Sequence, residues 1–170
     1  MDERISNRVS LAIIAIGAAA RLLPHPPNMT PLTAMALFGG ATLAPGSALL
    51  VPLGALALSD LLLGWHPTLP FVYACFLATA GIGLLVKNRG PRFIAGACLA
   101  SSVLFFVVTN FGVWLLSGMY ARDGAGLLAC YTAAVPFFRN ALLGDACYTV
   151  LLFGLERVSL RLLDRQSAAP

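Results

Sequence analysis

The sequence predicts an all-α polytopic integral membrane protein, a single domain over residues 1–170 built from a bundle of about six transmembrane helices. Two observations predict this class. Apolar residues make up 59% of the chain and charged residues only 11%, whereas a soluble domain carries roughly 25% charged residues. The mean hydropathy is +0.85, and apolar runs long enough to cross a bilayer follow one another with short breaks. Lipid is the solvent that this composition matches.

Six apolar stretches are the predicted spans, at about residues 7–23, 31–44, 47–63, 70–86, 93–117 and 140–157. The first follows a short basic stretch, as a cleaved signal peptide would, but the apolar runs continue after it, which favours a first span. The second is short for a bilayer about 30 Å thick, and Pro31 and Pro45 bound it. We therefore expect the second stretch to be tilted, kinked or buried in the bundle.

The distribution of basic residues predicts how the bundle is oriented across the membrane. With the N-terminus inside, the inner segments hold Arg4, Arg8, Lys87, Arg89, Arg92, Arg157, Arg161 and Arg165, and the outer segments hold Arg21, Arg122 and Arg139. Eight against three is a positive-inside bias, so both termini are expected in the cytoplasm. The last outer connection, residues 118–138, is long and still apolar over 126–138. This pattern predicts an interfacial or re-entrant helix there.

Few ionisable or amide side chains fall inside the predicted spans, and each is costly there unless it has a partner or a purpose. Arg21, Asp60, Asn110 and Asp145 all fall in the outer halves of their spans, whereas the cytoplasmic halves are almost wholly apolar. This asymmetry predicts a cavity open to the outside. The alternative is that Asp60 and Asp145 form internal ion pairs with Arg21 and Arg139.

Aromatic side chains at the same level, among them Trp114 and Tyr131, could stack on a ring-shaped ligand, although Trp and Tyr favour membrane interfaces in any case. The segment 21–30, RLLPHPPNMT, is stiffened by three prolines and presents His25 and Asn28. It is either a lid or wall of the cavity or a rigid connector.

Several function classes find no support. The basic residues are scattered and form no patch, which argues against a nucleic-acid partner. There is no phosphate-binding loop, and Lys87 is the only lysine, so the chain cannot hydrolyse ATP unaided. No known catalytic motif is found. His25, Asp60 and His66 match no local metal-ligand spacing, so neither a metal nor another cofactor is predicted.

Ala15 and Ala19 lie four residues apart in the first span and form a small face that permits close helix approach. Such a face serves either internal packing or the docking of a partner helix. The sequence leaves both possibilities open.

Four segments carry a family resemblance: RLLPHPPNMTPLTAMALFGGA at 21–41, ALSDLLLGWHP at 57–67, FFVVTNFGVW at 105–114 and CYTAAVPFFRNALLGD at 130–145. On these, the chain resembles an uncharacterised family of bacterial membrane proteins described as transport proteins. More distantly, its size, six spans and inside termini resemble the substrate-binding S components of energy-coupling factor (ECF) transporters.

The resemblance implies a capture protein of the bacterial cytoplasmic membrane that binds a vitamin-like or other micronutrient near the outer surface. It also implies that the first span meets a membrane coupling subunit driven by ATPases, with Ala15 and Ala19 as the docking residues. The residues expected around the ligand are Arg21, His25, Asn28, Asp60, His66, Asn110, Trp114, Tyr131, Arg139, Asn140 and Asp145. The alternatives are a structural or assembly protein that binds partner helices and, less favoured, a small intramembrane enzyme.

Overall fold

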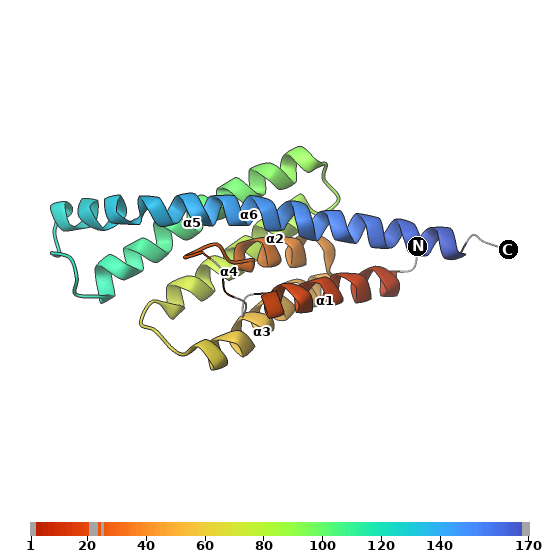
Figure 1. The fold of residues 1–170 in the computed structure, drawn as a ribbon, viewed down its shortest axis with the longest axis horizontal. Coiled ribbons are helices and arrows are strands. Elements are labelled where there is room, and N and C mark those ends of the chain that lie inside the picture. Colours follow the sequence, from red (N-terminus) through yellow and green to blue (C-terminus); the bar gives the residue numbers. More distant parts are fainter. Residues whose placement is uncertain (1–2, 21–23, 25, 168–170) are drawn as a thin grey trace.

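The computed structural model describes residues 3–20, 24 and 26–167, and the secondary structure within them is helical (Figure 1). The six helices are α1 Glu3–Ala20, α2 Leu32–Thr42, α3 Pro45–Leu63, α4 Leu69–Val86, α5 Pro91–Leu116 and α6 Gly124–Ser167. The predicted all-α class is confirmed.

Three of the helices are long and apolar enough to cross a membrane, over Leu69–Val86, Pro91–Leu116 and Gly124–Arg165. The other three carry shorter apolar stretches, Ile5–Ala20, Leu32–Thr42 and Pro45–Leu58. Length and composition therefore identify three candidate spans, fewer than the six that the hydropathy of the sequence predicts.

Proline marks the beginning of three helices. Pro45, Pro70 and Pro91 occupy the first or second position of α3, α4 and α5. The missing backbone N–H costs no hydrogen bond at such positions, because the first N–H groups of a helix have no partner within it. At the beginning of α6 the cap is a side chain, since Asp123 Oδ1 accepts a hydrogen bond of 2.7 Å from the Gly126 backbone N–H.

The short helix α2 lies at the centre of the bundle. It has 11 residues, so it is about 16 Å long, roughly half the thickness of the hydrocarbon layer. Residues 31–40 are all buried, and α2 contacts each of the other five helices. Of the three alternatives that the sequence left open for the second apolar stretch, tilted, kinked or buried in the bundle, the structure shows the buried one.

Two glycines allow α2 and α4 to cross closely. A Cβ atom on Gly83 would collide with the Leu37 carbonyl oxygen and would lie 2.9 Å from the Gly40 Cα, while a Cβ on Gly40 would collide with the Ala80 carbonyl oxygen. The two backbones are therefore in direct contact. Small residues at helix crossings are the usual means of close packing in membranes, where apolar burial gives no driving force between helices.

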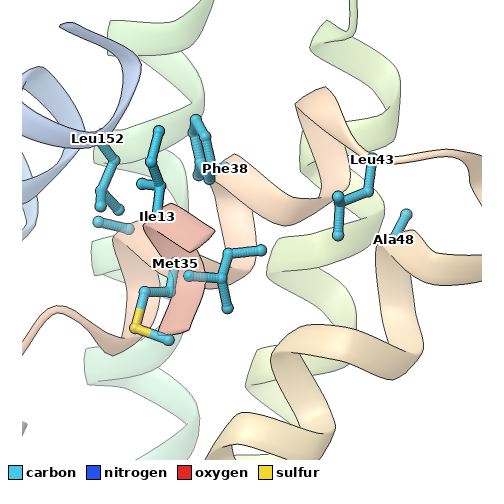
Figure 2. Packing of buried hydrophobic residues seen from close by; sticks show 8 residues of the cluster. Ile13, Met35, Phe38, Leu43, Ala48 and Leu152 are labelled. Carbon is cyan, nitrogen blue, oxygen red and sulfur yellow. The ribbon is translucent and has the colours of Figure 1, made fainter. Parts of the chain in front are cut away.

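Around α2 the apolar core draws on several helices. Figure 2 shows Ile13 from α1, Met35 and Phe38 from α2 and Leu152 from α6 gathered in one cluster. The ring of Phe38 also makes an edge contact with Phe153, with the ring centroids 5.1 Å apart. This packing joins the first and last helices of the chain through α2.

The last helix differs from the prediction. Residues 126–138 do not form a separate interfacial or re-entrant helix; they are the first part of α6, which is continuous over 44 residues and about 66 Å long. Pro136 lies inside it. A proline removes one helical hydrogen bond, and here this loss does not end the helix.

The ends of the bundle differ in charge. Figure 1 shows the beginning of α1 and the end of α6 on the same side as the α2–α3 and α4–α5 connections, with the α3–α4 and α5–α6 connections on the other side. Contacts join the first side: the Ala44 N–H donates to Asn7 Oδ1 at 3.3 Å, and Lys87 Nζ donates to the Leu43 carbonyl oxygen at 2.7 Å. We call this side, with Lys87, Arg89 and Arg157, the basic end.

Candidate functional site

A buried carboxylate lies near the middle of the bundle. The Asp145 side chain is only 4% exposed. Its Oδ2 accepts a hydrogen bond of 2.7 Å from the Ser102 hydroxyl, and the hydroxyl of Thr33 is a further hydrogen-bonding partner. Three helices thus converge here, with Asp145 on α6, Ser102 on α5 and Thr33 on α2. We call these three residues the polar centre.

The polar centre continues toward the basic end. The Ser102 hydroxyl lies 3.0 Å from the Cys98 carbonyl oxygen, which is a second acceptor for it, and the Thr149 hydroxyl donates to Cys98 Sγ at 3.4 Å. Cys98 and Thr149 are both buried. These hydroxyls are not among the residues that the sequence predicts for the site. The available signal was spacing, because Cys98 and Ser102, like Asp145 and Thr149, lie four residues apart and so share a helix face.

The depth of Asp145 corrects an expectation. The sequence predicts a span beginning near residue 140, which would place Asp145 near its outer end. In the structure α6 begins at Gly124 and runs antiparallel to α5, so that Asp145 lies opposite Ser102, near the middle of α5. The carboxylate is therefore as far from the ends of α5 as the helix allows.

Arg139 is not the partner of this carboxylate. Its side chain is exposed, and within the described part of the chain Asp145 bonds to neutral hydroxyls instead. The internal ion pair between Asp145 and Arg139 that the sequence left open is therefore not formed. Two other predicted ligand residues, Arg21 and His25, lie outside the described residues.

The remaining acidic candidate lies on α3. Asp60 is 4% exposed and sits one turn before the helix ends, where Gly64, at a φ of 97°, donates its N–H to the Asp60 carbonyl oxygen at 2.8 Å. His66 lies beyond that end and is exposed, and its Nδ1 is 2.8 Å from the Thr68 hydroxyl. The two residues thus occupy an interior and a surface position.

Three candidates on α5 and α6 use their polar atoms to bind the main chain. Asn110 Nδ2 donates to the Phe106 carbonyl oxygen at 2.7 Å, Trp114 Nε1 to that of Ala121 at 2.9 Å, and the Tyr131 hydroxyl to that of Val107 at 2.6 Å. The Tyr131 ring also packs edge-on against Phe106, with the centroids 5.6 Å apart. The Tyr131 contacts join α6 to α5 at the end away from the basic end, whereas Asn110 bonds within α5 and Trp114 bonds to the α5–α6 connection.

The proline-rich segment is tied to α6. Asn140 Nδ2 donates to the Pro27 carbonyl oxygen at 3.3 Å. Asn28, the next residue, is exposed and has a positive φ of 61°, which asparagine tolerates better than most residues. Gly144 lies under the same segment, because a Cβ there would be 2.9 Å from Met29 Cγ.

An apolar groove between α1 and α3 contains both predicted docking residues. Its volume is about 480 Å³, and its lining includes Ala15 and Ala19 from α1 and Gly54 and Ala55 from α3. Both alanines are exposed. The structure thus places the small face of α1 at the surface, where a partner could reach it.

A second cavity, of about 830 Å³, lies at the basic end between α5 and α6, and Cys98 and Thr149 line its inner wall. Among the described residues, no group of three His, Cys, Asp or Glu side chains is arranged to hold a metal ion. The groups of the polar centre are suited to hydrogen bonding with a ligand. A carboxylate flanked by hydroxyls accepts hydrogen bonds from a cation or from a ligand rich in N–H and O–H groups.

Comparison with protein families gives a match over nearly the whole chain. Residues 2–166 match the model of a family of unknown function, DUF6580. The chain belongs to this family. No curated protein and no solved structure is significantly similar to this DUF6580 member.

Proposed function

We propose that this protein is a membrane transport protein that captures a small metabolite, vitamin-like or another micronutrient, from the extracytoplasmic side. The solute would contact the polar centre, where Asp145 provides the charge and Ser102 and Thr33 provide hydroxyls. The proposal includes a place in the bacterial cytoplasmic membrane and a role similar to that of an S component. No catalytic step is part of it.

The buried carboxylate of Asp145 is the single observation that supports this function. Asp145 lies at mid-depth in a bundle whose other interior positions are largely apolar, and a charge at that depth in a membrane is costly. Well-packed apolar residues stabilise such an interior at least as well as buried charges do. An acidic side chain held by neutral hydroxyls therefore favours a role in binding over a role in stability.

A ligand screen tests the proposal. The protein in lipid nanodiscs is unfolded by heat in the presence of water-soluble vitamins, nucleobases, amino acids and polyamines. A solute present at one hundred times its dissociation constant would add about 2.7 kcal/mol to the free energy of unfolding, so at least one compound is expected to raise the melting temperature by several degrees. If no compound does so, and native mass spectrometry finds no co-purified small molecule, the proposal is wrong.

The topology belongs to the same proposal. We propose that α1 and α3 cross the membrane like the three longer helices, that α2 with the segment before it makes the second crossing, and that the basic end faces the cytoplasm. In a cysteine-free background, Arg89→Cys and Met119→Cys are then expected to react with a membrane-impermeant maleimide from opposite sides of the membrane. Both residues are exposed, and labelling of both from the same side contradicts the topology.

The groove between α1 and α3 favours a second candidate function, assembly with another membrane protein. Under the transport proposal the same groove would receive a coupling subunit. Leucine at Ala15 or Ala19 is expected to fill the groove and abolish a larger complex on native electrophoresis of membranes, with little change in the melting temperature. Leucine at Ala12, which is exposed on α1 but does not line the groove, is the control. A complex that survives Ala15→Leu and Ala19→Leu argues against docking here.

A further inference from the structure

The cavity at the basic end combines charge with apolar walls. Three basic side chains line it, Lys87, Arg89 and Arg157, against one acidic side chain, Glu156. Glu156 already accepts a hydrogen bond of 3.0 Å from the Ser10 hydroxyl. The charge available to a ligand at this end is therefore positive.

Two of the basic groups are held in place by neighbours. Lys87 Nζ donates one hydrogen bond to the Leu43 carbonyl oxygen, which leaves two of its three protons for a ligand. The guanidinium carbon of Arg89 lies 5.6 Å from the centre of the Phe93 ring, within the range of a cation–π contact. Arg157, on α6, is exposed. A phosphate at this rim would meet cations from α6 and from the α4–α5 connection.

Besides these charges and several polar side chains, among them Asn7 and Asn88, the cavity has a large apolar wall that opens sideways. Leu99 on α5 and Val150 on α6 both line it, and they are 52% and 75% exposed. Both lie within helices apolar enough to span the membrane, so in the membrane placement proposed above this opening faces hydrocarbon rather than water. These apolar side chains offer a water-soluble anion no hydrogen-bond partner, whereas an acyl chain can pack against them.

We propose that this cavity binds one anionic phospholipid from the leaflet at the basic end. The phosphate group lies among Lys87, Arg89 and Arg157, and one acyl chain runs along Leu99, Val150 and Phe153. Basic pockets between membrane helices on the cytoplasmic side are suited to anionic head groups. The site requires the membrane placement proposed above, but it does not depend on the nature of the transported solute.

Native mass spectrometry of the detergent-solubilised protein tests this site with two lipids that share acyl chains. Phosphatidylglycerol is expected to bind at least tenfold more tightly than phosphatidylcholine, and its affinity is expected to fall as salt is added. Arg157→Gln is expected to weaken phosphatidylglycerol binding about fivefold, the factor that corresponds to about 1 kcal/mol per basic residue. Arg139→Gln removes the same charge from an exposed position toward the other end of α6 and is expected to have no effect.

Two further measurements separate a lipid from a soluble anion. Ala146→Phe adds bulk to the cavity wall without changing its charge and is expected to lower phosphatidylglycerol binding as much as Arg157→Gln does. Glycerol 3-phosphate at millimolar concentration is expected not to displace the lipid. The proposal is overturned if glycerol 3-phosphate competes effectively, if the two lipids bind equally well, or if Arg139→Gln and Arg157→Gln weaken binding to the same extent.

Discussion

Valine at Gly83 is expected to lower the free energy of unfolding by about 3 kcal/mol or more, the upper part of the range for overpacked interiors. The added Cβ would collide with the Leu37 carbonyl oxygen and approach the Gly40 Cα. These atoms belong to the backbone, so no side-chain rotation can relieve the collision. The α2 and α4 helices must separate, and α2 contacts every other helix of the bundle. Thermal unfolding of the protein in detergent measures the loss.

Gly81 provides the matched control for this substitution. It lies on the same helix, two residues before Gly83, but a Cβ there would meet nothing within 4 Å. Gly81→Val is therefore expected to change the melting temperature by no more than a few degrees. Equal destabilisation by the two valines would show that valine is poorly tolerated throughout α4, and that the close crossing with α2 is not the cause.

Asparagine at Asp145 is expected to weaken solute binding by roughly 10- to 100-fold, the range for a lost hydrogen bond to a charged group. Asparagine keeps the shape of the side chain and an oxygen that can accept the Ser102 hydroxyl, so the fold should persist. The effect would be measured as loss of the ligand-induced rise in melting temperature. Asp123→Asn is the control, because Asp123 only caps the beginning of α6 and asparagine caps helices equally well.

Leucine at Asp145 separates binding from stability more sharply. It removes the buried carboxylate, while the Ser102 hydroxyl keeps the Cys98 carbonyl oxygen as an acceptor. The free energy of unfolding is expected to change by no more than about 1–3 kcal/mol, because the loss of a partner for the buried Thr33 hydroxyl opposes the gain from removing a buried charge. Solute binding is expected to be lost. A large drop in stability would instead assign Asp145 a structural role and count against the proposed function.

Much of the local structure follows from the sequence, because its causes are local. The starts of α3, α4 and α5 were predicted within two residues, since each follows a break in the apolar pattern and carries a proline in its first turn. The beginning of α6 was placed about sixteen residues too late. Pro136 and the polar pair Arg139 and Asn140 interrupt the apolar pattern there, but the helix continues through them.

The candidate site is also predictable only in part from the sequence. The chain itself indicates that Asp145 is a costly residue in an apolar stretch, but its partners Ser102 and Thr33 lie 43 and 112 residues away in sequence. The apolar stretches are hydrophobic on all sides, so their pattern does not show which face meets a neighbour. The depth of Asp145 also depends on the register between α5 and α6, which is a property of the pair and not of either helix.

Composition and the length of the apolar runs are enough to predict a helical protein suited to lipid, because they report directly on the solvent that a chain requires. The folded bundle alone shows that α2 lies buried at the centre, that a carboxylate and two hydroxyls meet near the middle of α5, and that an amphipathic cavity opens at the basic end. Those features arise where helices far apart in the chain come together. Their cause is the packing of side chains across helix faces, which depends on the whole bundle at once.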